Sequence, residues 1–187
     1  MLQRRVIEIG LFVAGSAGLL ALSWRSLRAP GAHGFPRFFA FEAVLALVLL
    51  HLRHWFARPL APHQIVSWLL LAASALLAFH GFDLLHRLGR PDAAHGKASD
   101  LGLERTSALV RTGAYRWIRH PLYASGVLGS WGVFFKGPSL AGGLLAAGAT
   151  LLFAATARQE EAENVEKFGP AYAEYARATW RFIPFVY

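Results

Sequence analysis

Apolar segments with almost no charged residues constrain this chain more than any other feature of its sequence. Residues 65–82 contain no Asp, Glu, Lys or Arg, and further apolar segments lie at 9–22, 38–52, 122–135 and 140–157, with Glu42 as their only charged residue. Because a backbone surrounded by lipid must satisfy its own hydrogen bonds, each segment is predicted to be a helix. A full span takes about 20 residues, so 38–52 and 122–135 are expected to extend into their polar flanks. The sequence therefore predicts an all-α, polytopic membrane helix bundle of about five spans, with 1–187 as a single membrane domain.

Composition and charge agree with a membrane protein and argue against other classes. The chain is 55% hydrophobic and 16% charged, whereas soluble domains contain about 25% charged residues. The formal net charge is +8, but the basic residues lie between apolar segments, which indicates loops beside anionic membrane lipids and not a nucleic-acid site. The absence of cysteine excludes disulfides, thiolate metal sites and a cysteine nucleophile.

The distribution of basic residues predicts how the bundle is oriented in the cell membrane. With five spans, most of the 19 Lys and Arg residues lie on the side that contains the first and third loops and the C-terminal tail. The positive-inside rule predicts that this side, with the C-terminus, is cytoplasmic and that the N-terminus lies on the opposite side. Trp24 and Arg25 follow the first apolar segment where a signal peptide would have small residues, so we expect a retained anchor.

The C-terminal half is predicted to contain a helical hairpin followed by an amphipathic helix. Lys136-Gly137-Pro138 is typical of a tight turn, and glycines recur along the segments on either side of it, which favours close helix packing in lipid. Residues 158–179 are expected to form an amphipathic helix that Gly169-Pro170 splits in two. The polar stretch RPDAAHGKASD at 90–100 is expected to be a flexible cytoplasmic loop.

The stretch RTGAYRWIRHPLY at 111–123 combines basic, aromatic and helix-starting residues. An interfacial anchor would explain its aromatic rings and arginines. It would not explain His120-Pro121 at the start of a helix, where proline is preorganised and free backbone N–H groups form an anion site. From the residues alone, both interpretations stay open.

Two adjacent carboxylates follow the last apolar segment. Glu160 and Glu161 could be a solvated part of a helix. Beside anionic lipid, however, such acids are unfavourable unless arginines or a cationic ligand accompany them, and the arginines of 111–123 are candidates.

The order LVRTGAYRWIRHPLY, an apolar hairpin, EE, FGPAYAEY and RFIP resembles the isoprenylcysteine carboxyl methyltransferase family and its phospholipid methyltransferase relatives. The resemblance covers about 107–187, which would be the catalytic and cofactor-binding half, while 1–106 would supply N-terminal spans and a loop. It implies a helix bundle whose C-terminal amphipathic helix caps a cytoplasmic pocket for S-adenosylmethionine. No GxGxxG occurs, so a Rossmann site is not expected. The resemblance assigns to the cofactor Ser107, Ala108, Leu109, Val110, Tyr115, His120, Pro121, Leu122, Tyr123 and Glu160.

The implied reaction transfers a methyl group to a lipophilic acceptor that enters from the bilayer. A carboxylate acceptor would need an arginine, for which Arg116, Arg119 and Arg181 are candidates. An amine or thiol acceptor would need a base, for which Glu161 and Tyr123 are candidates. No metal is required.

Two positions depart from the carboxyl methyltransferase pattern. Ser107 stands where eukaryotic members have a histidine, and Thr156 stands where they have a substrate-side arginine. Arg158 is nearby but would lie on another face of the helix. The identity of the acceptor is therefore left open.

Three other functions have some support in the sequence. Steroid-reductase-like membrane enzymes share an RHPxY-like motif but use NADPH. His51, His54 and His63 hint at a di-iron membrane oxidase, although such sites need several dense histidine boxes. A non-enzymatic membrane protein would use 111–123 and the carboxylate pair as interfacial anchors only. Glu42, inside the second apolar segment, could pair with a basic residue or line the path of the acceptor.

Overall fold

The computed structural model describes residues 2–89 and 106–185, and in these residues it is helical with no strand. Two short 3-10 helices, η1 and η2, accompany the α-helices. The elements are α1 (Leu2–Leu27), α2 (Gly34–Leu50), η1 (Leu52–His54), α3 (Pro62–Leu88), η2 (Gly113–Arg116), α4 (Pro121–Phe134), α5 (Leu140–Phe168) and α6 (Pro170–Ala178). The predicted all-α bundle is confirmed, and each of the five apolar segments lies in a different helix. The predicted loop at 90–100 lies outside the described residues.

Three helices of the described chain are long and apolar enough to cross a membrane. They comprise Arg5–Leu27, Pro62–Leu88 and Leu140–Phe168. The other two apolar segments form shorter helices, because α2 has 17 residues and α4 has 14. At 1.5 Å per residue α4 is only about 21 Å long, so the expectation that this segment extends into its polar flanks is wrong. The ring of Pro121 prevents α4 from extending toward the N-terminus, and the turn after Phe134 ends the helix.

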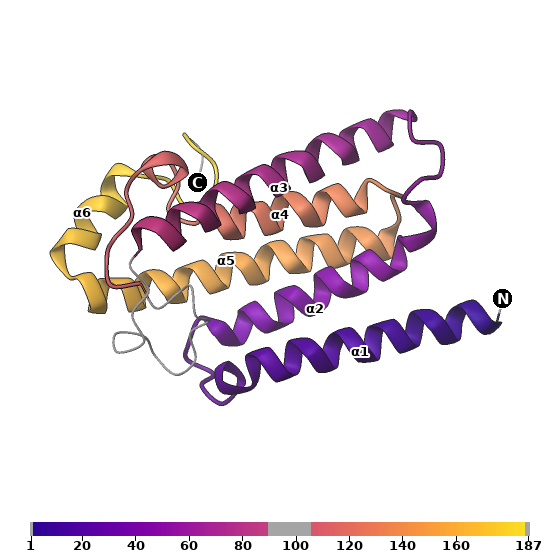
Figure 1. Cartoon of the computed structure of the whole chain (residues 1–187), viewed down its shortest axis with the longest axis horizontal. Helices are drawn as coiled ribbons and strands as arrows, with labels where there is room; N and C mark the ends of the chain where they lie inside the picture. Colours follow the sequence, from indigo (N-terminus) through magenta and orange to yellow (C-terminus); the bar gives the residue numbers. More distant parts are fainter. Residues whose placement is uncertain (1, 90–105, 186–187) are drawn as a thin grey trace.

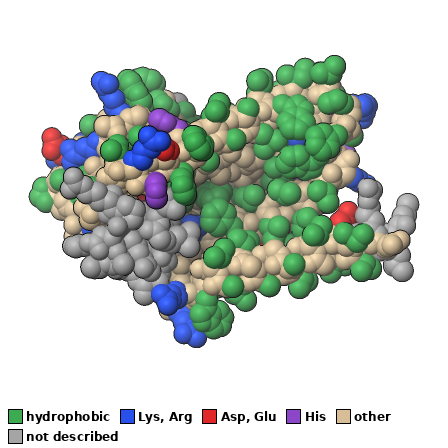
Figure 2. Space-filling view, viewed as in Figure 1, with side chains coloured by type: hydrophobic (Ala, Val, Ile, Leu, Met, Phe, Trp, Pro, Cys, Tyr) green, Lys and Arg blue, Asp and Glu red, His purple; other side chains and the backbone are tan. Residues whose placement is uncertain are grey.

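The helices α1 to α5 lie roughly side by side, with α5 near the middle of the bundle and α1 at one edge (Figure 1). The α1–α2 turn, the ends of α3 and α5, the start of α4 and all of α6 lie at one end. The α2–α3 connection and the α4–α5 turn lie at the other end. This arrangement places the basic stretches 111–119 and 158–181 at the same end of the molecule. Apolar side chains cover much of the length between the two ends (Figure 2).

Small residues bring α4 close to both neighbouring helices. A Cβ on Gly126 would lie 2.7 Å from the Phe153 ring of α5, which supports the predicted hairpin. A Cβ on Gly132 would lie 2.9 Å from Leu71, so this glycine faces α3 instead. Ser67 Oγ donates a 2.6 Å hydrogen bond to the carbonyl oxygen of Gly132 on the same face. The α4 glycines therefore pack against two helices and not only against the hairpin partner.

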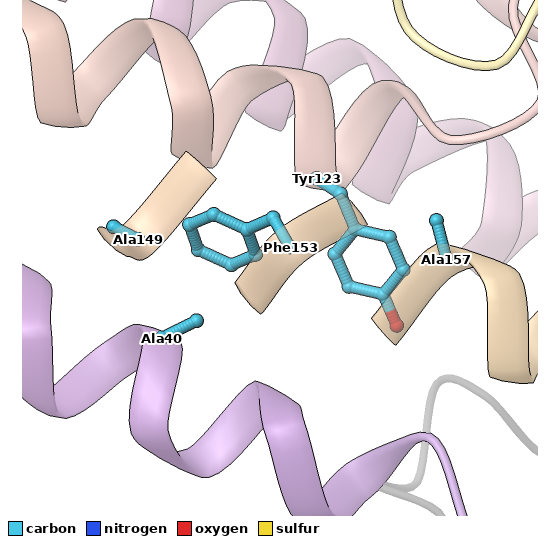
Figure 3. Packing of buried hydrophobic residues seen from close by; sticks show 5 residues of the cluster. All are labelled: Ala40, Tyr123, Ala149, Phe153 and Ala157. Carbon is cyan, nitrogen blue, oxygen red and sulfur yellow. The ribbon is translucent and has the colours of Figure 1, made fainter. Parts of the chain in front are cut away.

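A compact apolar cluster lies beside the start of α4. Tyr123 and Phe153 have ring centroids 6.1 Å apart, and they lie side by side between Ala149 and Ala157, with Ala40 of α2 facing them (Figure 3). The alanines leave room for the two rings between the helices. The cluster fixes the backbone from which the residues at the α4 start project.

A polar cluster closes the opposite end of the bundle. Lys136 is 1% exposed, its Nζ donates to Gln64 Oε1 over 3.1 Å, and it lies 3.0 Å from the Trp68 ring centroid. Burial lowers the pKa of Lys136. The His51 ring lies within hydrogen-bond distance of the Gly137 carbonyl oxygen, at 2.7 Å. These contacts join the α2–α3 connection to the α4–α5 turn.

The end of the bundle that contains α6 differs from the predicted layout in one respect. The fifth apolar segment and the first part of the predicted tail helix form a single helix, α5, which ends at Phe168. Gly169 then adopts a positive φ of 58°, and α6 starts at Pro170, so the predicted split at Gly169-Pro170 is confirmed. Because α5 is long and α4 is short, α5 continues past the start of α4. The residues there form the walls of a cavity.

Candidate active site

A partly open cavity of about 100 Å³ lies at the end of the bundle where α4 begins. Its walls come from α3, from the segment before α4, from the start of α4, and from α5 and α6. The lining residues are Leu85, Thr106, Ala108, Leu109, Val110, Tyr115, Arg119, His120, Leu122, Tyr123, Glu160, Asn164, Phe168, Tyr172 and Tyr175. The predicted C-terminal amphipathic helix therefore caps a cavity, as α6.

His120 is held between the two carboxylates of α5. The ring is 4% exposed, with Nε2 3.2 Å from Glu161 Oε1 and Nδ1 3.9 Å from Glu160 Oε2. Because a carboxylate accepts hydrogen bonds, the ring nitrogen Nε2 carries a proton in its contact with Glu161. Pro121 follows as the first helical residue, which fixes the point at which the ring leaves the backbone.

Glu161 is the centre of an ion cluster beneath the cavity. It accepts hydrogen bonds from Arg119 Nε at 2.8 Å and from Arg181 at 3.0 Å for Nε and 2.6 Å for Nη2. The His120 contact adds a third donor. With the side chain only 16% exposed, these charge-assisted bonds occupy the carboxylate. The arrangement suits a group that holds its neighbours in position.

Backbone pairing attaches the C-terminal segment to the start of α4. Arg119 N donates to Trp180 O over 2.8 Å, and Trp180 N donates to Trp117 O over 3.0 Å. His120 N also donates to the Arg181 carbonyl oxygen, so this N–H is not available to a bound anion. The Arg119 side chain donates to the carbonyl oxygens of Ala176 and Thr179. The RFIP motif therefore supports the His-Pro motif directly.

Glu160 is the carboxylate that faces the cavity. Its side chain is 26% exposed, and it accepts a hydrogen bond from the Tyr123 hydroxyl. Asn164 and Phe168 follow at intervals of four residues along α5, so all three side chains lie on one face of the helix. This face of α5 therefore presents a carboxylate, an amide and an aromatic ring to the cavity.

Tyrosines line the cavity on the side of α6. The Tyr175 hydroxyl donates to the Tyr115 carbonyl oxygen over 2.7 Å, which ties α6 to η2. Burial raises the pKa of Tyr115, Tyr172 and Tyr175, and for Tyr172 the charges of Glu161 and Glu160 add to the effect. These hydroxyls therefore remain neutral at physiological pH.

The structure brings together most, but not all, of the residues expected at the site. Ala108, Leu109, Val110, Tyr115, Arg119, His120, Leu122, Tyr123 and Glu160 line the cavity. Ser107 is exposed and Pro121 is buried, and neither is a lining residue. Glu161 and Arg181 form the ion cluster beside the cavity. Arg116 lines a different cavity.

Sequence reasoning missed several lining residues. Phe168, Tyr172 and Tyr175 stand in the FGPAYAEY motif, but no role was expected of them. The helical spacing from Glu160 could have identified Asn164 and Phe168. Leu85 and Thr106 carry no sequence signal, because only the fold brings them to the site.

Two positions noted in the sequence contribute no cation to the cavity. Thr156 is fully buried, and its hydroxyl donates to the Leu152 carbonyl oxygen over 2.8 Å. Arg158 is exposed. At mid-bundle, Glu42 accepts a 2.7 Å hydrogen bond from Ser16 Oγ of α1, so it joins α1 to α2 and does not reach the cavity.

The histidines that hinted at a metal site lie at the other end of the bundle. The rings of His51 and His54 are 6.0 Å apart, and His51 contacts backbone carbonyl oxygens. In the part of the chain that the structure describes, no three His, Cys, Asp or Glu side chains are grouped as metal ligands would be.

Comparison with known proteins identifies a family over most of the bundle. The family model described as phospholipid methyltransferase matches residues 62–171. The match begins at α3 and ends at the start of α6, so it extends further toward the N-terminus than the resemblance at 107–187.

One curated relative is the cobalt-zinc-cadmium resistance protein CzcN of Cupriavidus metallidurans, which is 38% identical over 81 residues. The aligned stretch is 43% of this chain and 37% of the relative, so the chain covers little more than a third of that protein.

Proposed function

The chain belongs to the phospholipid methyltransferase family of membrane methyltransferases, and from this membership we propose that it uses S-adenosylmethionine to methylate a lipophilic acceptor. The observation that carries the proposal is the cavity at the start of α4. There a carboxylate, an imidazole, a guanidinium and several aromatic rings converge within the matched residues or directly beside them.

The chemistry of the lining residues fits this cofactor. Glu160 would hold its amino group or a ribose hydroxyl, and His120 would donate to its carboxylate through the ring nitrogen that does not contact Glu161. Tyr115 and the α6 tyrosines would face the adenine and the positively charged sulfur, an attraction of about 0.5–2 kcal/mol per ring. When bound, the cofactor would supply an electrophilic methyl group on sulfur.

The chain would contribute positioning and proton transfer. Bringing the two reactants together in line accounts for most of the rate in such a displacement. Glu160, which accepts from the Tyr123 hydroxyl, would take a proton from an amine or thiol acceptor. Glu161 was expected, with Tyr123, as a candidate base. Its bonds to Arg119, Arg181 and His120 make it better suited to hold these side chains in position.

The cavity offers little for an acceptor carboxylate. Arg119 is bonded to Glu161 and to two carbonyl oxygens, Arg181 is bonded to Glu161, and position 156 carries a threonine bonded to its own helix. These contacts favour an amine or thiol acceptor over a carboxylate. The acceptor would approach from the bilayer, and the cofactor from the end of the bundle that the charge distribution predicts to be cytoplasmic.

Calorimetry on detergent-purified protein tests the proposal. S-adenosylmethionine and S-adenosylhomocysteine should each bind with micromolar affinity. The variants His120→Ala and Glu160→Ala should each weaken this binding by about tenfold or more. Arg177→Gln is the matched control, because Arg177 is exposed on α6 and does not line the cavity. NADPH is titrated alongside. No binding of either adenosyl ligand to folded protein would contradict the proposal, and a response to NADPH would favour the membrane-reductase alternative.

A further inference from the structure

A second cavity, of about 200 Å³, lies between α6 and the segment that contains η2. Its lining residues are Arg111, Arg116, Glu174, Tyr175, Ala178 and Thr179. Tyr175 belongs to both cavities, so the two spaces lie on either side of the same side chain. The family assignment gives this second cavity no role.

Two guanidinium groups give the second cavity a positive charge. Arg116 lies 5.5 Å from the Trp117 ring centroid, and Arg111 lies 5.7 Å from the Tyr175 ring centroid. Arg111 also donates to the Ala171 carbonyl oxygen over 2.6 Å. Although Glu174 lines the same cavity, neither arginine forms an ion pair with any carboxylate among residues 2–89 and 106–185. Arginine pairs present donors in the geometry that phosphate groups accept.

The surroundings of this cavity suit the headgroup layer of a membrane. The Trp117 residue is 48% exposed. Phe185 is 78% exposed, and its ring centroid lies 4.6 Å from that of Trp180, whose backbone N–H donates to the Trp117 carbonyl oxygen. Trp beside arginine is typical of the membrane interface, where the ring meets lipid and the cation meets phosphate. Basic side chains gather at this end of the molecule, next to exposed apolar ones (Figure 2).

We propose that the second cavity binds the phosphate of an anionic phospholipid from the surrounding bilayer. Arg111 and Arg116 would donate to the phosphate oxygens, and Trp117 would lie beside the glycerol backbone. The lipid would be a bound ligand and not the methyl acceptor, because Tyr175 separates its phosphate from the first cavity.

The position of Tyr175 gives the lipid an effect on the first cavity, and this step rests on the proposed function. The Arg111 side chain donates a hydrogen bond to the carbonyl oxygen of Ala171 at the start of α6, and the Tyr175 hydroxyl donates one to the carbonyl oxygen of Tyr115. A phosphate held by Arg111 would favour the arrangement in which α6 covers the first cavity. Anionic lipid would therefore raise the affinity for the adenosyl ligand without touching it.

Lipid nanodiscs of defined composition test both parts. We expect replacing a third of the phosphatidylcholine by phosphatidylglycerol to raise S-adenosylhomocysteine affinity about fivefold in the native chain and in Arg177→Gln. Arg116→Gln should keep the affinity measured in pure phosphatidylcholine and lose that gain. Native mass spectrometry should show one phosphatidylglycerol retained by the native chain and by Arg177→Gln, but not by Arg116→Gln.

Two results would overturn the proposal. An equal gain in Arg116→Gln would show that the effect does not involve this cavity. The same gain with inorganic phosphate in pure phosphatidylcholine would identify a site for free phosphate and not for lipid. If no adenosyl ligand binds in any bilayer, the proposed function fails, and the mass spectra alone decide whether Arg116-dependent lipid retention exists.

Discussion

At the scale of single residues, the two adjacent carboxylates of α5 have different environments and therefore different roles. Glu160 faces the cavity and accepts from Tyr123, whereas Glu161 is bonded by Arg119, Arg181 and His120. Adjacent residues on a helix point about 100° apart, so one carboxylate can face a ligand while the other faces protein.

Glutamine at each position should separate these roles. Glu161→Gln removes the charge that three partners share, so we expect a loss of about 3 kcal/mol in stability. Glu160→Gln should change the thermal midpoint by only about 2 °C, yet weaken S-adenosylhomocysteine binding by about tenfold. Thermal unfolding and calorimetry on the same preparations check both. Equal loss of stability in the two variants would contradict the assignment.

The buried tyrosines predict a loss of stability at alkaline pH. Burial raises the pKa of Tyr172 above its value of about 10 in an unfolded chain, so the folded state keeps a proton that the unfolded state releases. The contribution of Tyr172 to the stability of the fold is therefore fully present below about pH 10 and is lost as the pH rises above this value. Thermal midpoints measured from pH 7 to pH 11 should decline less steeply in Tyr172→Phe. A slope unchanged by this substitution would show that Tyr172 does not titrate in this way.

Many of the cavity residues could be predicted from sequence because they stand together in short motifs. His120, Tyr123 and Glu160 lie in or beside segments of unusual composition, and the resemblance assigned them to one site. Leu85 could not be predicted, because nothing local distinguishes it from other apolar residues of α3. Arg116 was placed in the site from its neighbours in the sequence, but η2 turns it toward the second cavity.

At the scale of helices, the unequal lengths of α4 and α5 create the site. The short α4 begins at Pro121, while α5 continues to Phe168 and carries the carboxylates past that point. Hydropathy identified all five apolar segments, because it detects continuous runs of apolar residues. It could not show that α4 stays short or that α5 continues into the polar tail, because helix ends depend on caps and packing.

The reversal between α5 and α6 depends on a glycine. Gly169 has a φ of 58°, which side chains rarely adopt, so Gly169→Ala should cost about 1 kcal/mol and weaken S-adenosylhomocysteine binding by displacing α6. Gly148 is the matched control, because a Cβ there would meet nothing within 4 Å in the middle of α5. Gly148→Ala should leave stability unchanged or raise it slightly. Thermal unfolding and calorimetry compare the pair, and equal behaviour would contradict the role of Gly169.

At the scale of the whole molecule, the fold collects chemistry at one end and structural contacts at the other. Both cavities and the Glu161 cluster lie where α4 begins, while Lys136, Gln64 and His51 close the opposite end. The charge distribution predicts that the end with the cavities is cytoplasmic.

Cysteine labelling tests this orientation cleanly, because the chain has no cysteine. Gly31→Cys and Arg177→Cys lie at the cavity end and Ala57→Cys lies at the other, and all three positions are exposed. In intact cells a membrane-impermeant maleimide should label only Ala57→Cys. Labelling of all three variants after membrane permeabilisation is the control. Labelling of Arg177→Cys in intact cells would reverse the predicted orientation.

The central claim is that the cavity at the start of α4 binds S-adenosylmethionine. The most direct measurement is photo-crosslinking of the radiolabelled cofactor to the purified protein, followed by mapping of the labelled peptides. The account predicts label in peptides from 106–123 and 160–175, competed by excess S-adenosylhomocysteine. Label confined to α1 or α2, or label that S-adenosylhomocysteine does not displace, would contradict it.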